Sequence, residues 1–227
     1  NINNISNTIF KNLKAPSLKG FSLYGAVNFI NSENYISDTI FIKSHSEDFV
    51  NFINSKTELE NIELINTASD AIDVDDGKLK FTNLKCKDIG NDCLDFSNSE
   101  INGKNFFAER VQDKSISVGE KSKVEIKNLN LNNSEIAIAV KDSSKAKVSN
   151  IKINNSTVPF AVFVKKSEYG PAYLKVDNLI LNNSNEVFLV DKVSTLKIDG
   201  KRIFGNLEGK NIEGMMYGNL YGKQTKR

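Results

Sequence analysis

One short pattern occurs three times in the middle of the chain, as SDAIDVDDGK at 69–78, NDCLDFSNSE at 91–100 and DKSISVGEKS at 113–122. The apolar residues at the centre of these copies, Ile72, Leu94 and Ile116, are twenty-two residues apart. The same interval extends outward to Val50 and Ile138. A fixed period of this length with extended segments in each repeat predicts a solenoid, in which every turn stacks on the one before.

Alternating apolar and polar residues fill the rest of each repeat. Segments such as 79–81, 124–126 and 146–148 lead to a recurring asparagine, and a second short alternation follows it. These asparagines are Asn61, Asn83, Asn105, Asn128 and Asn150. Period-two alternation indicates a strand with one buried face. Three short strands with bends fit about 22 residues per turn, and their copies must pair in parallel. We therefore predict an all-β fold, a parallel β-helix solenoid with three short strands per turn.

The regularity of the repeat divides the chain into three parts. The regular β-helix is expected at 57–200, with a loop at 167–172 that widens one turn. Residues 1–56 keep alternating patches at looser spacing and are expected to form irregular turns of the same solenoid. Residues 201–227 contain no repeat and are expected to form a cap or a tail. Because the chain begins abruptly in repeat-like sequence, we expect it to be a fragment of a longer protein.

The composition limits the classes of partner. Thirty basic and twenty-eight acidic residues give a net charge of +2, which argues against a polybasic nucleic-acid or membrane-surface binder. With 39% apolar and 26% charged residues, the chain is too polar for membrane insertion and is long enough for one domain. We therefore expect no nucleic-acid partner and no membrane insertion.

Cysteine and histidine are scarce. Cys86 and Cys93 are the only two cysteines, and we interpret them as free thiols that leave the redox compartment open. His45 is the only histidine, so a histidine-based metal site or a Ser-His-Asp triad is not expected. Any role of His45 beyond packing at a bend would come from proximity to Asp48.

A column of charged residues lies two positions before the repeating apolar residue. It contains Asp48, Asp70 and Asp92 and then changes sign at Lys114. Two carboxylates on stacked turns, about 4.8 Å apart, repel by roughly 3.5 kcal/mol at an effective dielectric constant of about 20. Three arrangements relieve this repulsion: each Asp caps its own bend, Ca²⁺ binds to Asp48, Asp70 and Asp92, or Asp70 and Asp92 form a catalytic carboxylate pair.

A second column is expected to face solvent on the same sheet. Asp73 and Asp95 stand in it, between Asn51 and Ser117, if Ile72 and its equivalents point into the core. Small residues beside these charges would leave a shallow groove, which suits an extended sugar chain. The alternative is an ordinary solvated sheet face. Tyr169 and Tyr173 flank the predicted loop, where they either pack on the sheet or stack on a sugar ring.

Three motifs resemble known enzymes. Residues 69–73, 90–94 and 114–119 are similar to three consecutive motifs of the polygalacturonase family of pectin hydrolases, and residues 20–200 resemble the right-handed parallel β-helix (pectate-lyase-like) superfamily. The resemblance implies that Asp70 and Asp92 match the family's acids. Asn91 stands where a further acid is expected, Lys114 stands where a histidine is expected, and no downstream Arg-x-Lys triplet follows.

Two classes of function follow from these patterns. The first is a polysaccharide-interacting, carbohydrate-active lyase or hydrolase. In it Asp70, Asp92, Asp73 and Asp95 act as general acids or metal ligands, and Lys114 acts as a base or as a clamp for substrate charge. The second is a non-catalytic extracellular β-helix with a structural or adhesive role. In both cases the expected partner is a polysaccharide or oligosaccharide, and the expected location is secreted, periplasmic or cell-surface.

Overall fold

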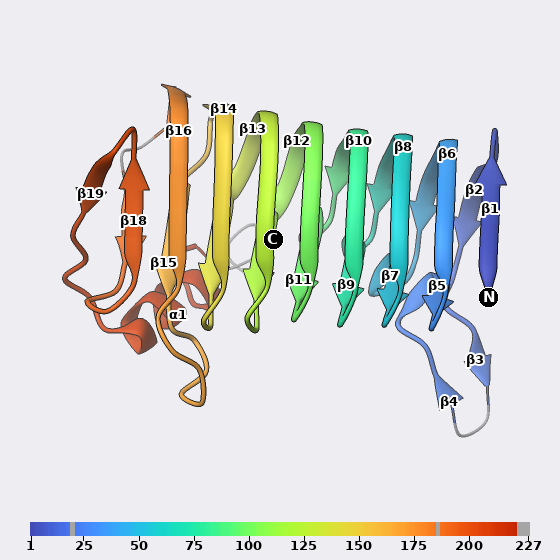
Figure 1. Ribbon diagram of the computed structural model, residues 1–227, viewed down its shortest axis with the longest axis horizontal. Coiled ribbons are helices and arrows are strands. Elements are labelled where there is room, and N and C mark those ends of the chain that lie inside the picture. Colours follow the sequence, from blue (N-terminus) through green and yellow to red (C-terminus); the bar gives the residue numbers. More distant parts are fainter. Residues whose placement is uncertain (19–20, 185–186, 222–227) are drawn as a thin grey trace.

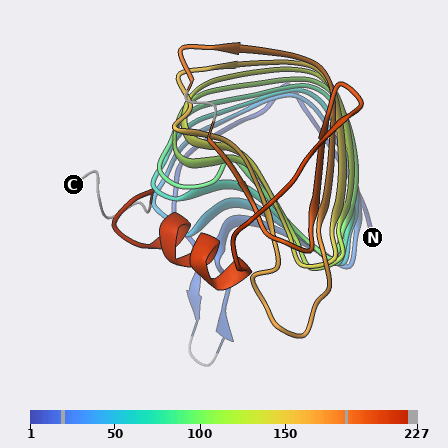
Figure 2. The same ribbon diagram turned by 90° about the vertical axis from the view of Figure 1, so that its left-hand side faces the viewer.

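The computed structural model describes residues 1–18, 21–184 and 187–221 as a right-handed parallel β-helix of about eight turns with roughly 22 residues per turn (Figure 1). Seen end-on, the turns superimpose as a single coil (Figure 2). This confirms the predicted fold class and period. Residues 19–20, 185–186 and 222–227, which fall within the predicted N-terminal turns, regular helix and tail, lie outside the described residues.

Each turn contributes one segment to each of three walls. Wall 1 consists of β5 (Gly25–Ile30), β7 (Asp48–Ile53), β9 (Asp70–Asp75), β11 (Leu94–Ser97), β15 (Val158–Phe163), β17 (Phe188–Val190) and the last residues of β12 (Glu100–Gly119) and β13 (Lys123–Lys141). Its strands pair in parallel one turn apart, with Leu94 opposite both Ile72 and Ile116. The copies of the repeating pattern therefore lie directly above one another.

Walls 2 and 3 share most of their strands, which bend between the two walls at an asparagine or, in β6, at Asp38, whereas β1 and β18 lie in wall 2 and β2 lies in wall 3. The strands are β1 (Ile2–Ser6), β2 (Ile9–Leu13), β6 (Glu33–Ser44), β8 (Lys56–Thr67), β10 (Lys78–Ile89), the first parts of β12 and β13, β14 (Lys145–Asn154), β16 (Tyr173–Asn182) and β18 (Thr195–Ile198). In β10, for example, residues 78–82 belong to wall 2 and residues 84–89 to wall 3. The two predicted strands of these walls are thus one bent strand.

The bend is built from a ladder of asparagines. Asn83 adopts a φ of 57°, a left-handed conformation that asparagine accepts more readily than most residues. Its Nδ2 donates to Oδ1 of Asn61 at 2.8 Å, and Asn105 donates in turn to Asn83 at 2.8 Å. The ladder continues through Asn128, Asn150 and Asn178. The recurring asparagines therefore form this corner in the successive turns from Asn61 to Asn178 and bond each corner to the next, and Asn61 bonds in the same way to Asp38, which forms the corner of β6.

The core is a continuous apolar column inside the coil. Ile72, Leu94, Ile116 and Ile138 are each at most 1% exposed, as the repeat predicts. Large side chains such as Phe81 and Phe96 fill the space between the walls. Since each fully buried residue of this kind contributes about 1.5–3 kcal/mol, stacking of the turns provides the main stabilisation.

The interpretation of the cysteines as free thiols is wrong. Cys86 and Cys93 form a disulfide, and both are fully buried. Cys86 points inward from wall 3, and Cys93 points inward at the start of wall 1 in the same turn. The bend between these walls brings the two side chains together. The disulfide therefore fastens the bend that carries Asp92.

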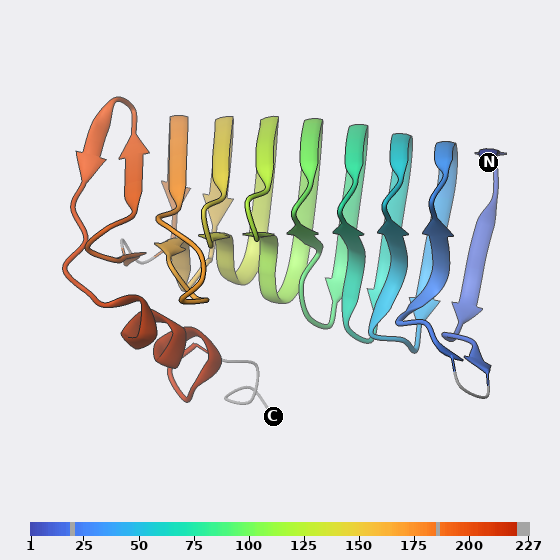
Figure 3. The same ribbon diagram turned by 60° about the horizontal axis from the view of Figure 1, so that its bottom comes forward.

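Smaller elements project from the coil. Hairpin β3 (Ser17–Leu18) and β4 (Phe21–Ser22) follows β2, and β19 (Lys201–Ile203) pairs antiparallel with β18. Helix α1 (Gly209–Tyr217) lies on the same side of the coil as the hairpin (Figure 2). The two stand at opposite ends of the row of turns (Figure 3). Within the described part of the chain, no helix is long and apolar enough to cross a membrane.

Candidate functional site

The predicted acidic residues come together on wall 1. Asp48 is the register partner of Asp70 in the neighbouring strand, and Asp73 is the partner of Asp95. The column of Asp48, Asp70, Asp92 and Lys114 runs along the beginning of the wall 1 strands. Asp73 and Asp95 follow three residues later in their strands, beside Asn51 and Ser117. The structure thus brings all the predicted site residues into one area.

The aspartates of the first column bond to the backbone of the next turn. Oδ1 of Asp70 accepts a hydrogen bond from the backbone N–H of Asp92 at 2.9 Å and one from Asn91 Nδ2 at 2.6 Å. Oδ1 of Asp92 accepts one from the backbone N–H of Lys114 at 3.0 Å. Backbone donors therefore relieve part of the repulsion that the column predicts.

Lys114 ends the acidic part of the column with a buried ion pair. Its Nζ lies 3.2 and 3.3 Å from the two carboxylate oxygens of Asp92 and 2.5 Å from Oδ2 of Asp113. The side chains of Lys114 and Asp92 are only 3% and 4% exposed. These two predicted site residues therefore lie beneath the surface, whereas Asp70 is half-buried.

The second column supplies the carboxyl groups that are more accessible. Asp73 and Asp95 are half-buried. Asn51 Nδ2 donates to Asp48 at 3.1 Å and lies 3.4 Å from Oδ2 of Asp73. Next to Asp95, the ammonium group of the buried Lys141 donates to Ser117 Oγ at 3.0 Å. A carboxyl group and a buried ammonium group thus lie side by side at this end of the acidic area.

Burial and mutual repulsion raise the pKa values of the carboxyl groups. Burial, together with the charges of Asp75 and Asp95, raises the pKa of Asp73 to about 9. Burial and the charge of Asp92 raise the pKa of Asp70 to about 8. Burial raises the pKa of Asp48 to about 6. At neutral pH, Asp70 and Asp73 therefore hold a proton.

The ion pair between Asp92 and Lys114 acts against burial, because each charge favours the ionised form of the other group. Burial raises the pKa of Asp92, and the Lys114 ammonium opposes this rise. Burial opposes the charge of Lys114, but Asp92 and Asp113 hold its pKa well above the usual value. Lys114 therefore remains an ammonium at neutral pH, which favours a role through its charge over a role as a base.

Helix α1 covers the continuation of the same columns. After Lys114, the first column continues with Ile136 and Val158, and these residues pack with Ile212 and Met216 of the helix. The Tyr217 ring at the end of α1 lies 5.2 Å from Lys114 Nζ and 4.3 Å from Lys165 Nζ. The polar area of wall 1 therefore ends where the helix begins.

Sequence reasoning missed α1, Tyr217 and Lys165 as parts of this site. A usable signal was present at 136–140 and 158–163, where apolar residues run continuously instead of alternating. Such a run indicates a strand that is buried on both faces. The outer face of wall 1 therefore had to be covered there by another element.

The two tyrosines that flank the loop lie beside different walls. Tyr169 lines a cavity of about 360 Å³ next to wall 1, together with Ser97, Glu120 and Lys166, and Lys121 Nζ lies 5.6 Å from its ring. Tyr173 lies on wall 2, where Lys197 Nζ is 6.0 Å from its ring. Tyr169 is therefore the tyrosine that adjoins the candidate site.

The structure also places His45 and the predicted calcium ligands. His45 is exposed and bonds to Asn12 at 3.2 Å. No group of three or more histidine, cysteine, aspartate or glutamate side chains within residues 1–18, 21–184 and 187–221 is arranged to hold a metal ion. Of the three predicted calcium ligands, Asp92 has both oxygens bonded to Lys114, Asp48 is 4% exposed and accepts from Asn51, and Asp70 accepts two hydrogen bonds on Oδ1.

The fold and the carboxyl groups define a right-handed parallel β-helix with a cluster of carboxyl groups on one wall. No protein-family model and no curated protein sequence matches the chain. Among solved structures, it is similar to the catalytic domain of a GH87 alpha-1,3-glucanase in complex with nigerose, with 12% identity, a TM-score of 0.44, and coverage of 86% of this chain and 55% of that one. A variant of that domain in complex with tetrasaccharides shows 13% identity, a TM-score of 0.42 and the same coverage. The chain thus spans about half the length of these structures.

Proposed function

We propose that the chain binds a polysaccharide along the outer face of wall 1 and cleaves it by acid–base chemistry. The observation that supports this most is the environment of Asp70. Its carboxyl group is half-buried next to Asp92, whose charge is held in place by the buried Lys114. Partly buried carboxyl groups with strongly perturbed pKa values, such as Asp70, are concentrated at catalytic sites.

Asp70 is the proton donor in this proposal. The hydrogen bonds that it accepts from Asn91 and from the Asp92 backbone both end on Oδ1, so Oδ2 is the oxygen that carries the proton. With a pKa of about 8, the carboxyl group is protonated at neutral pH and acidic enough to release the proton to a leaving oxygen. Asp92 and Lys114 act as positioning residues, since both are buried.

Asp95 is the proposed base. It is half-buried on the same outer face, and burial raises its pKa against the opposing charge of Lys141. During hydrolysis, the glycosidic oxygen would take the proton of Asp70 as its bond to the anomeric carbon breaks. A water molecule would attack that carbon and lose its proton to Asp95. Asp73, which is protonated at neutral pH, would donate a hydrogen bond to a sugar hydroxyl.

The neighbouring elements suit a chain-like substrate. The acidic area lies between the β3–β4 hairpin and α1, which stand at opposite ends of the row of turns (Figure 3). The cavity beside Tyr169 offers a place for a sugar residue next to the carboxyl groups. A secreted, periplasmic or cell-surface location is part of the proposal, because disulfides such as Cys86–Cys93 persist in oxidising compartments.

A second candidate is binding without cleavage. The burial of Asp92 and Lys114 favours it, because side chains that are 4% and 3% exposed cannot reach a sugar on the surface. In that case the outer face of wall 1 would hold a glycan through hydrogen bonds alone. The chain would then serve as an adhesive or structural module.

A glycan panel separates the two candidates. We expect the wild-type chain to release shorter products from at least one polysaccharide, and Asp70→Asn to lower turnover by about 10²–10⁴-fold while binding persists. Asp177→Asn is the matched control, because this carboxylate pairs with the half-exposed Lys175 on another wall. Binding without products, for wild type and both variants, would replace the enzymatic proposal with the binding role.

The calcium role is tested separately. If Ca²⁺ binds between Asp48 and Asp70, both must be ionised, so its effect requires a pH above the Asp70 pKa of about 8. We expect Ca²⁺ at ten times its Kd to stabilise the chain by about 1.4 kcal/mol at pH 9 and to have little effect at pH 6. Thermal melts with Ca²⁺ or EDTA measure this, and Asp48→Asn should abolish the effect. Identical melting curves at pH 9 would contradict a calcium site.

A further inference from the structure

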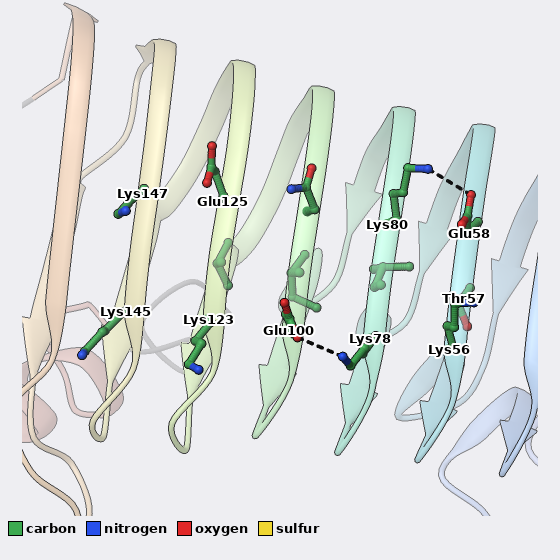
Figure 4. Close-up of a pocket in the computed structure, with 14 residues that line it drawn as sticks. Lys56, Thr57, Glu58, Lys78, Lys80, Glu100, Lys123, Glu125, Lys145 and Lys147 are labelled. Atoms are coloured by element: carbon green, nitrogen blue, oxygen red, sulfur yellow. Dashed lines mark hydrogen bonds and ion pairs between the residues drawn. The ribbon is translucent and has the colours of Figure 1, made fainter.

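The outer face of wall 2 carries two parallel columns of charged side chains. Between them runs a shallow groove of about 440 Å³ (Figure 4). One column contains Lys56, Lys78, Glu100, Lys123 and Lys145, and the other contains Glu58, Lys80, Asn102, Glu125 and Lys147. Successive residues of a β-strand point to opposite faces, so residues two positions apart share a face. Each strand therefore supplies one residue to each column. The charges therefore form a regular array along the axis of the coil.

The two halves of this array differ in ion pairing. On β8, β10 and β12, acids neutralise the lysines: Lys78 pairs with Glu100 at 3.2 Å and Lys80 with Glu58 at 3.2 Å (Figure 4). On β13 and β14, none of the ion pairs within the described part of the chain involves Lys123, Lys145 or Lys147. The array is thus balanced at one end and positively charged at the other.

The excess positive charge continues along the next turns. Lys147 is the register partner of Lys175, and Lys175 is the partner of Lys197. Lys197 is in turn opposite Arg202 of β19. Like charges directly opposite one another on neighbouring strands are destabilising. Only Lys175 has a carboxylate partner, Asp177 at 2.6 Å, so the repulsion in this column is largely uncompensated among the residues that the structure describes.

We propose that this basic face, formed by Lys123, Lys145, Lys147, Lys175 and Lys197, docks a linear anionic polysaccharide. Successive ammonium groups follow the spacing of the turns, about 4.8 Å, which is comparable with one sugar residue in an extended chain. A polymer with one carboxylate or sulfate on each sugar therefore meets one lysine per turn. The interaction is independent of the acidic wall 1 and would keep the chain attached to an anionic matrix.

The surroundings favour a polysaccharide over a nucleic acid. Proteins that bind single-stranded nucleic acid combine a basic groove with several aromatic side chains on which bases stack. Among the residues that the structure describes, two aromatic rings lie beside the basic face: Tyr173, 6.0 Å from Lys197 Nζ, and Phe204, 5.2 Å from the guanidinium group of Arg202.

Two triple variants test the proposal. The first is Lys123→Gln, Lys145→Gln and Lys147→Gln, and the matched control is Lys56→Gln, Lys78→Gln and Lys80→Gln, which removes three paired lysines from the same wall. Calorimetric titration at low salt would use dextran sulfate, polygalacturonate, neutral dextran and single-stranded DNA. We expect the wild type to bind the sulfated or the carboxylated chain, with about tenfold or greater weakening in the first variant and less than about twofold in the control.

Each outcome has a defined meaning. Binding of dextran sulfate alone or of polygalacturonate alone supports the proposal and identifies the anionic group. Equal weakening in both triple variants would overturn it, because the effect would then follow net charge and not this face. Absence of binding, or equal affinity for single-stranded DNA, would overturn it as well. Asp70→Asn should leave this binding unchanged, and a loss in that variant would place the polymer on wall 1. Circular dichroism spectra confirm that the variants are folded.

Discussion

Leu94→Asp is expected to unfold several turns of the β-helix. Leu94 is fully buried in the apolar column between Ile72 and Ile116. A carboxylate at this position would have no partner, and a buried, unpaired charge destabilises a protein by about 5 kcal/mol or more. The loss is comparable with the total stability of a typical domain, about 5–15 kcal/mol. Since each turn contacts only its neighbours, the damage spreads outward from this turn.

Thermal melting followed by circular dichroism measures this effect. The matched control is Asn102→Asp, which adds the same charge to an exposed position of wall 2 one turn away. We expect the control to melt within a few degrees of the wild type. If Leu94→Asp also melted within a degree or two of the wild type, the assigned register of the turns would be incorrect.

Lys114→Met is expected to lower the stability by about 3–5 kcal/mol at pH 8, because removal of one partner leaves buried carboxylates without compensation. Methionine has a similar length but cannot donate to Asp92 or Asp113. The matched control is Lys56→Met, whose ion pair with Glu33 is exposed to solvent and should contribute little to stability. Chemical denaturation at several pH values measures both variants.

The loss of stability caused by Lys114→Met should depend on pH. Burial raises the pKa of Asp92 in the folded chain, and removal of the Lys114 ammonium takes away the strongest opposing charge, leaving only Lys141 and the backbone N–H of residue 114 to oppose that rise. A carboxyl group whose folded pKa exceeds its unfolded value, about 3.9, binds its proton more tightly when folded. Its contribution to stability is therefore present at low pH and is lost as the pH rises through the folded pKa. We expect the deficit to be small near pH 4 and to grow toward pH 8.

The same variant also probes the proposed mechanism. If Asp92 becomes protonated, its charge no longer raises the pKa of Asp70. The pH above which turnover falls should then shift downward. A loss of stability with unchanged glycan binding and turnover would limit Lys114 to a structural role. Unchanged stability at pH 8 would contradict the buried ion pair itself.

The sequence predicted the fold because the interval of twenty-two residues is carried by residues that must be buried. Ile72, Leu94 and Ile116 cannot all face water. Their equal spacing indicates stacked turns, in which the three residues form one buried column. The recurring asparagines added the corners. The disulfide was missed because its two cysteines lie on different walls, and only the bend between the walls brings them into contact.

The candidate site was predicted less completely, for two physical reasons. Strict alternation would place Asp70 and Ile72 on the same face, but Ala71 and Ile72 are both buried, so the chain departs from a regular strand where the site begins. The depth of a side chain also depends on distant residues. Tyr217 and α1 cover Lys114 from the end of the chain, and no local pattern around Lys114 reveals that cover.

The asparagine ladder has a consequence for how this chain can change in evolution. The inner asparagines of the ladder, Asn83, Asn105, Asn128 and Asn150, each accept an amide hydrogen bond from the next turn and donate one to the turn before, so these corners are interchangeable. Unequal recombination between two repeats in the gene would therefore add or delete a whole copy and still join matching corners. A lineage could lengthen or shorten the rod in this way, while selection acted independently on the few copies that carry Asp70, Asp92 and Lys114.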